Sequence, residues 1–171
     1  MKPDHKAILC LGSNINPEIN LLRAIELLAE HGTVYSHSSA WESPAMGSVS
    51  PNYLNACLVF LTSLDEETLR EKVIRPIETK LGRIRSSDMF APRTIDIDLV
   101  MFDDVAHKEE YWNRAYFLIP LSQIEPEINN PLSHETARQS TERIRSQSWI
   151  RERTDVMKQK HGSNLQRSSA S

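Results

Sequence analysis

The segment YLNACLVFLT, residues 53–62, decides the fold, because it predicts the most strongly apolar strand of the chain. Its polar side chains are Tyr53, Asn55 and Thr62, and its β-branched and aromatic residues favour extended backbone. Both of its faces are largely apolar, so we expect this strand at the centre of a sheet. Alternation places every second residue on one face: Tyr53, Asn55, Cys57, Val59 and Leu61.

Towards the N-terminus the sequence predicts a strand, a helix and a second strand. An apolar run at residues 7–11 indicates a buried strand that ends in a Gly-Ser-Asn turn. A helix follows, with Asn16 as its cap, Pro17 in its first position and Gly32 at its end. Residues 33–41, rich in β-branched, aromatic and serine residues, predict the next strand.

Towards the C-terminus the sequence predicts a second helix and a further strand, each preceded by a loop. Residues 42–52 form a long polar loop, which indicates a functional lip. Residues 65–81 carry apolar residues at intervals of four and predict a helix that Pro76 bends. An arginine-bearing loop, residues 83–93, leads into a strand at residues 94–102. The order strand, helix, strand, strand, helix, strand predicts an α+β, ferredoxin-like fold, an antiparallel sheet of about four central strands with helices packed on it.

Charge divides the chain into two unequal parts. The 171 residues carry a net charge of −3, which argues against a protein that binds nucleic acid through its overall charge. From residue 132 onward, however, eight basic residues face four acids. We therefore expect an acidic folded domain at residues 1–131 and a polar, basic, partly helical extension at residues 132–171. Residues 134–158 predict a polar helix, and residues 162–171 predict disorder.

Cysteine usage and hydropathy indicate the compartment. Cys10 and Cys57 both lie in predicted buried strands, where a free thiol behaves as a small apolar side chain, so we expect a reducing cytoplasm. Apolar runs are too short for a signal peptide or a membrane helix, and we expect neither processing nor a membrane partner. The histidines show no metal-ligand spacing.

The segment APRTIDIDL, residues 91–99, carries the clearest chemical signal. Asp96 and Asp98 lie two residues apart on a predicted strand, so their carboxylates point to the same face. Two ionised carboxylates on an apolar strand repel each other unless a cation lies between them, and Mg²⁺ prefers oxygen ligands. The alternative is an exposed edge strand with two solvated acids.

Three arginines approach the same strand from the preceding loop. Arg83, Arg85 and Arg93 could form salt bridges or bind phosphate oxygens. Magnesium together with arginine is the combination that phosphoryl transfer uses. The glycine turn at residues 12–14 lacks the GK[ST] element of a P-loop, so any nucleotide must be held by other means.

Six ordered blocks make a family resemblance specific. They cover the interval from about residue 7 to residue 131: LGSN (11–14), SPAMG (43–47), YLN (53–55), LGRIR (81–85), APRTIDIDL (91–99) and IPLSQIEPEI (119–128). The chain resembles the 6-hydroxymethyl-7,8-dihydropterin pyrophosphokinase family of folate biosynthesis. The resemblance implies a ferredoxin-like fold and transfer of the β,γ-pyrophosphoryl group of ATP to the hydroxymethyl oxygen of the pterin, with release of AMP.

The resemblance also implies a role for individual residues. Asp96 and Asp98 match the ligands of Mg²⁺, with two ions expected, and Arg83 and Arg93 match the arginines that stabilise the transferring phosphates. The positions expected near ATP are Glu78, Arg85, Lys108 and Arg114. The positions expected around the pterin, with its ring between the last two, are Ser43, Pro44, Met46, Tyr53, Asn55, Phe90 and Tyr116.

Departures from the family pattern fall on the nucleotide side. The Pro-His-Pro element expected before Arg114 is missing, and His107 with Lys108 is its nearest substitute. Met89 stands where a basic residue is typical, and Phe90 where tryptophan is frequent. Two alternatives therefore stay open: a weakened or inactive pterin- or nucleotide-binding paralogue, and a nucleic-acid-binding module with a ferredoxin-like fold. The oligomeric state is left open by the sequence.

Overall fold

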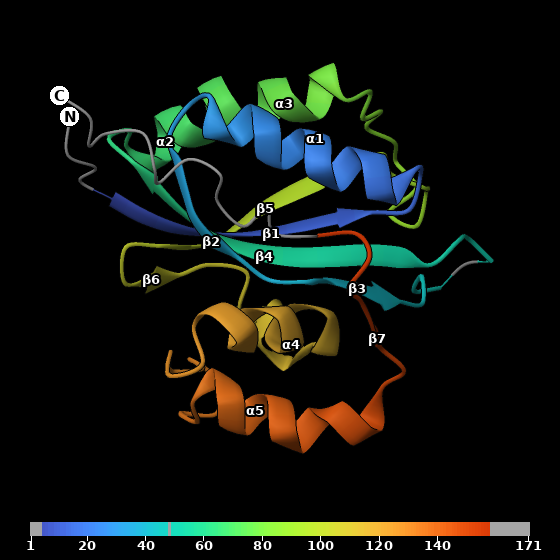
Figure 1. Cartoon of the computed structure of the whole chain (residues 1–171), viewed down its shortest axis with the longest axis vertical. Coiled ribbons are helices and arrows are strands. Elements are labelled where there is room, and N and C mark those ends of the chain that lie inside the picture. Colours follow the sequence, from blue (N-terminus) through green and yellow to red (C-terminus); the bar gives the residue numbers. More distant parts are fainter. Residues whose placement is uncertain (1–4, 48, 158–171) are drawn as a thin grey trace, which may run out of the picture.

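The computed structural model describes residues 5–47 and 49–157, which form three layers. A single antiparallel sheet is the middle layer (Figure 1). Helices α1, α2 and α3 cover one face of this sheet, and α4 and α5 lie on the other. No helix in these two described ranges is long and apolar enough to cross a membrane.

The sheet has seven strands in the order β6-β5-β1-β4-β3-β7, with β2 also pairing with β4. All the pairings along this path are antiparallel. The order β5-β1-β4-β2 is that of a split βαβ arrangement, so the predicted ferredoxin-like fold is confirmed. The strands are β1 (His5–Ser13), β2 (Thr33–His37), β3 (Ala40–Ser43), β4 (Tyr53–Thr62), β5 (Asp96–Phe102), β6 (Val105–Ala106) and β7 (Arg151–Arg153).

Strand β4 lies at the centre because its two faces enter two different cores. Leu54, Ala56, Leu58 and Phe60 pack towards α1 (Pro17–Ala29) and α3 (Arg75–Lys80). Cys57 faces the opposite way, into a core with α4 (Ala115–Ile124) and α5 (Ala137–Ile144). Alternate side chains of β4 thus pack against different helical layers, as expected from its sequence.

The strand expected at residues 33–41 is two strands, and both pair with β4. The ladder breaks at Ser38, whose hydroxyl accepts the backbone N–H of Cys57 at 2.9 Å. The prediction of one continuous strand was wrong, because this side chain replaces a ladder bond and lets the chain kink. β3 then extends to Ser43, two residues further than expected.

The helical segment expected at residues 65–81 contains a wide π turn. Its parts are α2 (Glu66–Thr68), the π turn η1 (Leu69–Ile74) and α3, and Asp65 caps the start by accepting from Thr68 N–H at 2.8 Å. Pro76 has no N–H to donate, and the N–H of Arg75 bonds Arg70, five residues back. Proline therefore causes a bulge rather than a simple bend.

The start of α1 departs from the expected cap. Pro17 opens the helix as predicted, but the Asn16 side chain makes no capping hydrogen bond. Asn16 has a left-handed backbone, with φ of 43°. The proline that follows disfavours the right-handed helical region at this position, so the chain enters the helix through a turn instead.

The C-terminal region packs against the rest of the molecule. A helix over residues 134–158 was predicted, but the structure has α5, a 3₁₀ turn η3 (Arg145–Gln147) and β7, which pairs with β3. Thr136 and Gln139 form a capping box at the start of α5. Val156 and Met157 are buried in the core beneath α1 and α3, so the polar extension also contributes apolar side chains to the core. The predicted disorder of residues 162–171 lies outside the described residues.

Candidate active site

A cavity of about 290 Å³ opens on the α4 face of the sheet. Strands β5, β1 and β4 form its floor, and α4 and the 3₁₀ turn η2 (Glu109–Asn113) contribute its side. The loops after β3 and before β5 form its rim. Its lining includes ten of the residues singled out by sequence, namely Ser43, Pro44, Met46, Tyr53, Asn55, Phe90, Arg93, Asp96, Asp98 and Tyr116.

Register across the sheet explains why the two carboxylates open into this cavity. Asp96 pairs with Gly12 of β1 and Asp98 with Cys10, while Ile97 between them is buried on the other face. Both aspartate side chains are 17% exposed. Gly12 has no side chain, and a Cβ there would lie 3.4 Å from the Asn55 side-chain oxygen, so glycine keeps the floor open between Asp96 and Asn55.

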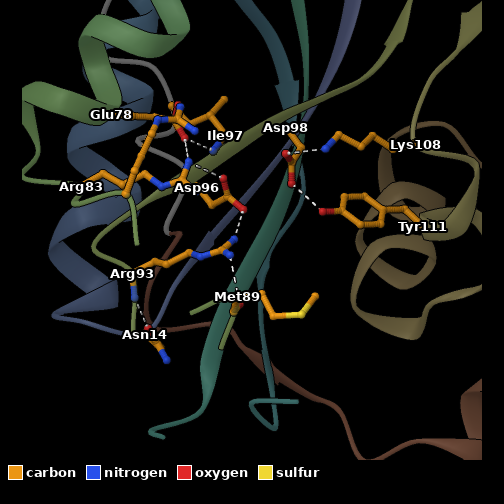
Figure 2. A network of polar contacts seen from close by, with 11 residues as sticks. Asn14, Glu78, Arg83, Met89, Arg93, Asp96, Ile97, Asp98, Lys108 and Tyr111 are labelled. Carbon is orange, nitrogen blue, oxygen red and sulfur yellow. Dashed lines mark hydrogen bonds and ion pairs between the residues drawn. The ribbon is translucent and has the colours of Figure 1, made fainter. Parts of the chain in front are cut away.

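Asp96 is held by two arginines. Arg83 Nη1 lies 3.0 Å from Asp96 Oδ1, and Arg93 Nη1 lies 2.9 Å from Asp96 Oδ2 (Figure 2). The same Arg83 nitrogen donates to Glu78 Oε2 at 2.7 Å, and Ile97 N–H donates to that oxygen at 3.1 Å. Burial raises the pKa of Glu78, whose side chain is 5% exposed. Glu78 thus supports Arg83 from inside the protein.

The Gly-Ser-Asn turn after β1 fixes the backbone of the arginine loop. Asn14 Oδ1 accepts from Arg93 N–H at 2.7 Å, and Asn14 N–H donates to the Arg93 carbonyl at 3.0 Å. Arg93 Nη2 also donates to the carbonyl of Met89 at 3.1 Å. This buried asparagine therefore determines where the Arg93 guanidinium enters the cavity (Figure 2).

Asp98 has different partners. Tyr111 donates its hydroxyl to Asp98 Oδ2 at 2.9 Å, and Lys108 Nζ lies 3.7 Å from Asp98 Oδ1. Burial and then the charge of Asp96 raise the pKa of Asp98. Burial and the neighbouring Asp98 also raise the pKa of Tyr111, so its hydroxyl remains a donor. A largely buried carboxylate whose pKa is raised by a neighbouring carboxylate is a site that a cation would stabilise.

The opposite end of the cavity is neutral and aromatic. Asn55 donates both amide N–H groups, to the Trp41 carbonyl at 3.2 Å and to Ser43 Oγ at 2.8 Å. These bonds leave the amide oxygen as an acceptor towards the cavity. Tyr53 and Tyr116 line the same end, and burial raises the pKa of both hydroxyls. A flat heterocycle with polar edges matches such a lining.

The two rim loops contact each other at Gly47 and Phe90. Gly47 has φ of 69°, and a Cβ at this position would lie 2.9 Å from the ring of Phe90. Phe90 therefore packs against Gly47, where any residue with a side chain would clash with the ring. The ring is 43% exposed, so its position depends on the rim loops rather than on the core.

Several predicted residues lie outside the cavity lining. Arg85 is 66% exposed and lies 3.5 Å from Glu78. Arg114 lines a second, neighbouring cavity, and His107 Nε2 lies 2.8 Å from Glu66 Oε1. Conversely, the cavity contains Cys10, Gly12, Ala45, Met89 and Tyr111, to which the sequence analysis gave no binding role. Tyr111 follows a short irregular segment, and no pattern in the sequence indicated that it reaches Asp98.

The carboxylate pair fits magnesium bound together with a phosphate substrate. Within residues 5–47 and 49–157, no cluster of three or more His, Cys, Asp or Glu side chains could hold a metal alone. Mg²⁺ commonly takes one or two carboxylates and completes its shell with substrate phosphates and water. Asp96 and Asp98 provide that incomplete ligand set, and the nearby arginines could bind the remaining phosphate charge.

The cavity has two carboxylates and Arg93 at one end and an aromatic, amide-lined pocket at the other. This lining suits a transferase that moves phosphate groups onto a flat substrate. Comparison with known proteins makes the class specific. The chain belongs to the 7,8-dihydro-6-hydroxymethylpterin-pyrophosphokinase (HPPK) family, whose model matches residues 8–126.

Curated relatives agree with this family. The chain is 34% identical over 152 residues to 2-amino-4-hydroxy-6-hydroxymethyldihydropteridine pyrophosphokinase of Synechocystis sp., covering 82% of this chain and 76% of the relative. It is 31% identical over 134 residues to the Helicobacter pylori enzyme of the same name, covering 69% and 80%. A crystal structure of Plasmodium falciparum HPPK-DHPS with pteroate has the same fold, with a TM-score of 0.66 and 14% identity, covering 86% of this chain and 44% of that one.

Family membership gives the activity in general terms. The chain is a pyrophosphokinase of folate biosynthesis, a transferase of the HPPK family. The family generally uses Mg-ATP and acts on a pterin substrate. The resemblance drawn from the six sequence blocks is confirmed.

Proposed function

We propose that the two ends of the cavity divide the work of pyrophosphoryl transfer from ATP to 6-hydroxymethyl-7,8-dihydropterin. The charged end holds the triphosphate and the neutral end holds the pterin. The supporting observation is that one cavity joins both sets of side chains across three adjacent strands. The reacting groups would then meet above Gly12, where no side chain intervenes.

At the charged end, Asp96 and Asp98 would hold two Mg²⁺ ions that bind together with ATP. When bound, the ions would neutralise phosphate charge and align the β-phosphorus for attack. Asp96 must then share its oxygens between Arg83, Arg93 and a cation. Tyr111 supports the pair by fixing Oδ2 of Asp98, and a cation would bind Oδ1 in competition with Lys108, which lies 3.7 Å from it.

The arginines would bind the oxygens of the transferring group. Arg93 is 28% exposed and lies in the cavity wall, whereas Arg83 is 13% exposed and lies behind Asp96. Arg83 Nε is buried and has no hydrogen-bond partner within the described chain. We therefore propose that Arg93 contacts phosphate directly. Arg83 would bind phosphate from its place behind Asp96, where the buried Glu78 holds its guanidinium. Arg85, which lies 3.5 Å from Glu78, would approach the nucleotide from the exposed loop.

At the neutral end, the Asn55 oxygen would accept from an N–H group of the pterin. Tyr116 and Phe90 would lie on its two faces, and Tyr53 with residues 43–46 would close the wall. A ring held in this way places its hydroxymethyl group towards β5 and the phosphates. Positioning of this kind is the main contribution a protein makes to phosphoryl transfer.

Product analysis tests the proposed reaction directly. Purified protein with Mg²⁺, ATP and the hydroxymethyl pterin should release AMP and pterin diphosphate in equal amounts. Formation of ADP instead would show transfer of a single phosphate and contradict the proposal. The same assay without Mg²⁺ should give no product.

A weakened paralogue is the second candidate, and one observation favours it. The substitutes for the missing Pro-His-Pro element are engaged elsewhere, Lys108 beside Asp98 and His107 beside Glu66. At least two charge-assisted phosphate contacts, those of the missing Pro-His-Pro element and of the basic residue that Met89 replaces, would then be lost without compensation. Each is worth about tenfold to a hundredfold in ATP affinity. Calorimetry with Mg-ATP and with a pterin separately should show weak nucleotide binding and ordinary pterin binding. Tight ATP binding that survives Lys108→Ala and His107→Ala would contradict this reading.

The cytoplasm is the compartment that we propose. Cys10 and Cys57 are free and buried, which suits a reducing environment. We propose small molecules as the substrates and no nucleic-acid or membrane partner.

A further inference from the structure

The orientation of the Asn55 amide depends entirely on β3. One N–H donates to the carbonyl of Trp41 and the other to the hydroxyl of Ser43, at 3.2 and 2.8 Å. A carbonyl only accepts, so the Trp41 bond decides which end of the amide is nitrogen. A shift of β3 along or away from β4 would therefore turn the acceptor that faces the cavity.

Strand β3 is short and would be an edge of the sheet without the C-terminal segment. β3 has four residues, and its outer side pairs with β7, where Ala40 lies opposite Arg153 and Trp41 opposite Glu152. The strand that orients Asn55 on one side is thus covered on the other side by residues beyond the family match at 8–126.

Side chains fasten β7 to this strand. Arg153 is 20% exposed and binds Glu42 of β3 at 3.2 Å and Glu18 of α1 at 3.4 Å. Glu152 accepts from the hydroxyl of Ser39 at 2.7 Å. Arg153 therefore bridges β3 to the helical layer on the far face of the sheet.

The rim beyond β3 has little packing behind it. A second cavity of about 330 Å³ separates residues 43–46 from residues 148–150, with half-exposed Trp149 on its outer side. Residues 43–46 consequently lie between two cavities, and their position depends on where β3 ends. The chain after β7 is anchored, because Val156 and Met157 are buried.

From these contacts we infer that the C-terminal segment, residues 151–157, positions the pterin-binding edge of the site, with Arg153 as a positioning residue that acts through Glu42, β3 and Asn55. The inference rests on the proposed role of Asn55 as a pterin contact. It predicts that a change far from the phosphates alters pterin binding selectively.

The test is Arg153→Met in the full chain, which keeps the aliphatic stem and removes the ion pairs. Dissociation constants for a pterin and for Mg-ATP are measured by calorimetry, with kcat, both KM values and the melting temperature. We expect pterin Kd and KM to rise about three- to tenfold, with kcat and ATP constants changed less than about twofold. Arg151→Met is the matched control, since Arg151 lies on the same strand, is 61% exposed and reaches Glu42 only at 3.6 Å. It should leave every constant within about twofold.

A double-mutant cycle separates this inference from the proposed site. In an Asn55→Ala background, Arg153→Met should have no further effect on pterin Kd. If Asn55→Ala weakens pterin binding and Arg153→Met does not, the positioning role is wrong and the proposed site stands. If Asn55→Ala leaves pterin binding unchanged, the proposed site fails and the positioning role with it. Should Arg153→Met fold poorly, Glu42→Gln breaks the Arg153–Glu42 pair from the other side. If either variant lost as much affinity for ATP as for the pterin, the inference would be overturned.

Discussion

Different kinds of interaction hold the side chains in place at the two ends of the cavity. At β5 the principal charged groups already contact opposite charges, with Asp96 between two arginines and Asp98 beside Lys108. At β3 and β4 one amide is oriented by a carbonyl and a hydroxyl, with aromatic rings around it. The charged end must exchange ionic partners when a phosphate substrate enters, whereas the neutral end is already formed.

This difference predicts how substitutions divide between rate and binding. Groups at the charged end meet charge that changes during the reaction, so their loss should lower kcat. Groups at the neutral end contact a ring that does not react, so their loss should raise the pterin Kd.

The largest effect is expected from the carboxylates. Asp96→Asn and Asp98→Asn should each lower kcat by roughly a thousandfold, because the charge that holds Mg²⁺ is lost. Pterin Kd should change by less than about twofold. Initial rates of AMP formation and pterin calorimetry measure both, and near-normal turnover in both variants would end the metal-ligand assignment.

The same two variants should differ in stability without metal. Asp98→Asn should leave the melting temperature unchanged or raise it, since it removes repulsion from Asp96. Asp96→Asn should lower it, because Arg83 and Arg93 lose the carboxylate between them. Equal melting temperatures would show that these contacts contribute little to the fold.

The next effect is that of the wall arginine. Arg93→Ala should lower kcat by about a hundredfold to a thousandfold with pterin Kd nearly unchanged. Arg83→Ala should lower kcat as well but also the melting temperature, because Glu78 would remain buried without its main partner. Single-turnover rates and thermal unfolding separate these outcomes, and a pure rise in pterin Kd would contradict the division of roles.

A smaller effect, of the opposite kind, is expected from the amide. Asn55→Ala should raise pterin Kd by about tenfold to a hundredfold and leave kcat at saturating pterin within about twofold. Tyr53→Ala should act in the same direction. Fluorescence titration with a pterin provides the constant, and a loss of kcat without a change in Kd would place Asn55 among the reacting groups.

The smallest effect is expected at the tyrosine that supports Asp98. Tyr111→Phe removes one hydrogen bond to a proposed ligand and should raise the Mg²⁺ concentration for half-maximal activity by about tenfold. Binding of Mg-ATP measured by calorimetry should weaken in parallel. Tyr35→Phe on β2, where the side chain is 71% exposed, is the control that should change neither.

Much of the sheet was predictable because its information is local. The alternation in β4 and the apolar run in β1 each determine a strand and its faces without reference to the rest of the chain. The aspartate pair was predictable for the same reason, since residues two apart on a strand share a face. Pro17 likewise indicated where α1 begins, and Gly82 indicated that the second helical segment ends just before it, whereas α1 ends at Ala29, before the predicted stop at Gly32.

What the sequence did not show depends on contacts between distant segments. The split at Ser38 requires the N–H of Cys57, and β7 requires β3, a partner more than a hundred residues earlier. Tyr111 reaches Asp98 only because η2 lies against β5. Glu78 was expected near ATP, but no sequence pattern indicated that it is buried and accepts from the N–H of Ile97 on β5.

The π turn ahead of Pro76 has a consequence for how this helical segment tolerates deletion. A π turn closes its hydrogen bonds over five residues instead of four, so Leu69–Ile74 holds one residue more than the same stretch of α-helix would. Removing one residue from this turn would return the segment to α-helical bonding and leave α3 facing the sheet as before. Removing one residue between Arg75 and Glu78 would instead turn the rest of α3 by about 100° and take the Glu78 carboxylate away from Arg83 and the N–H of Ile97, so the π turn is the part of this segment that can lose a residue without loss of the site.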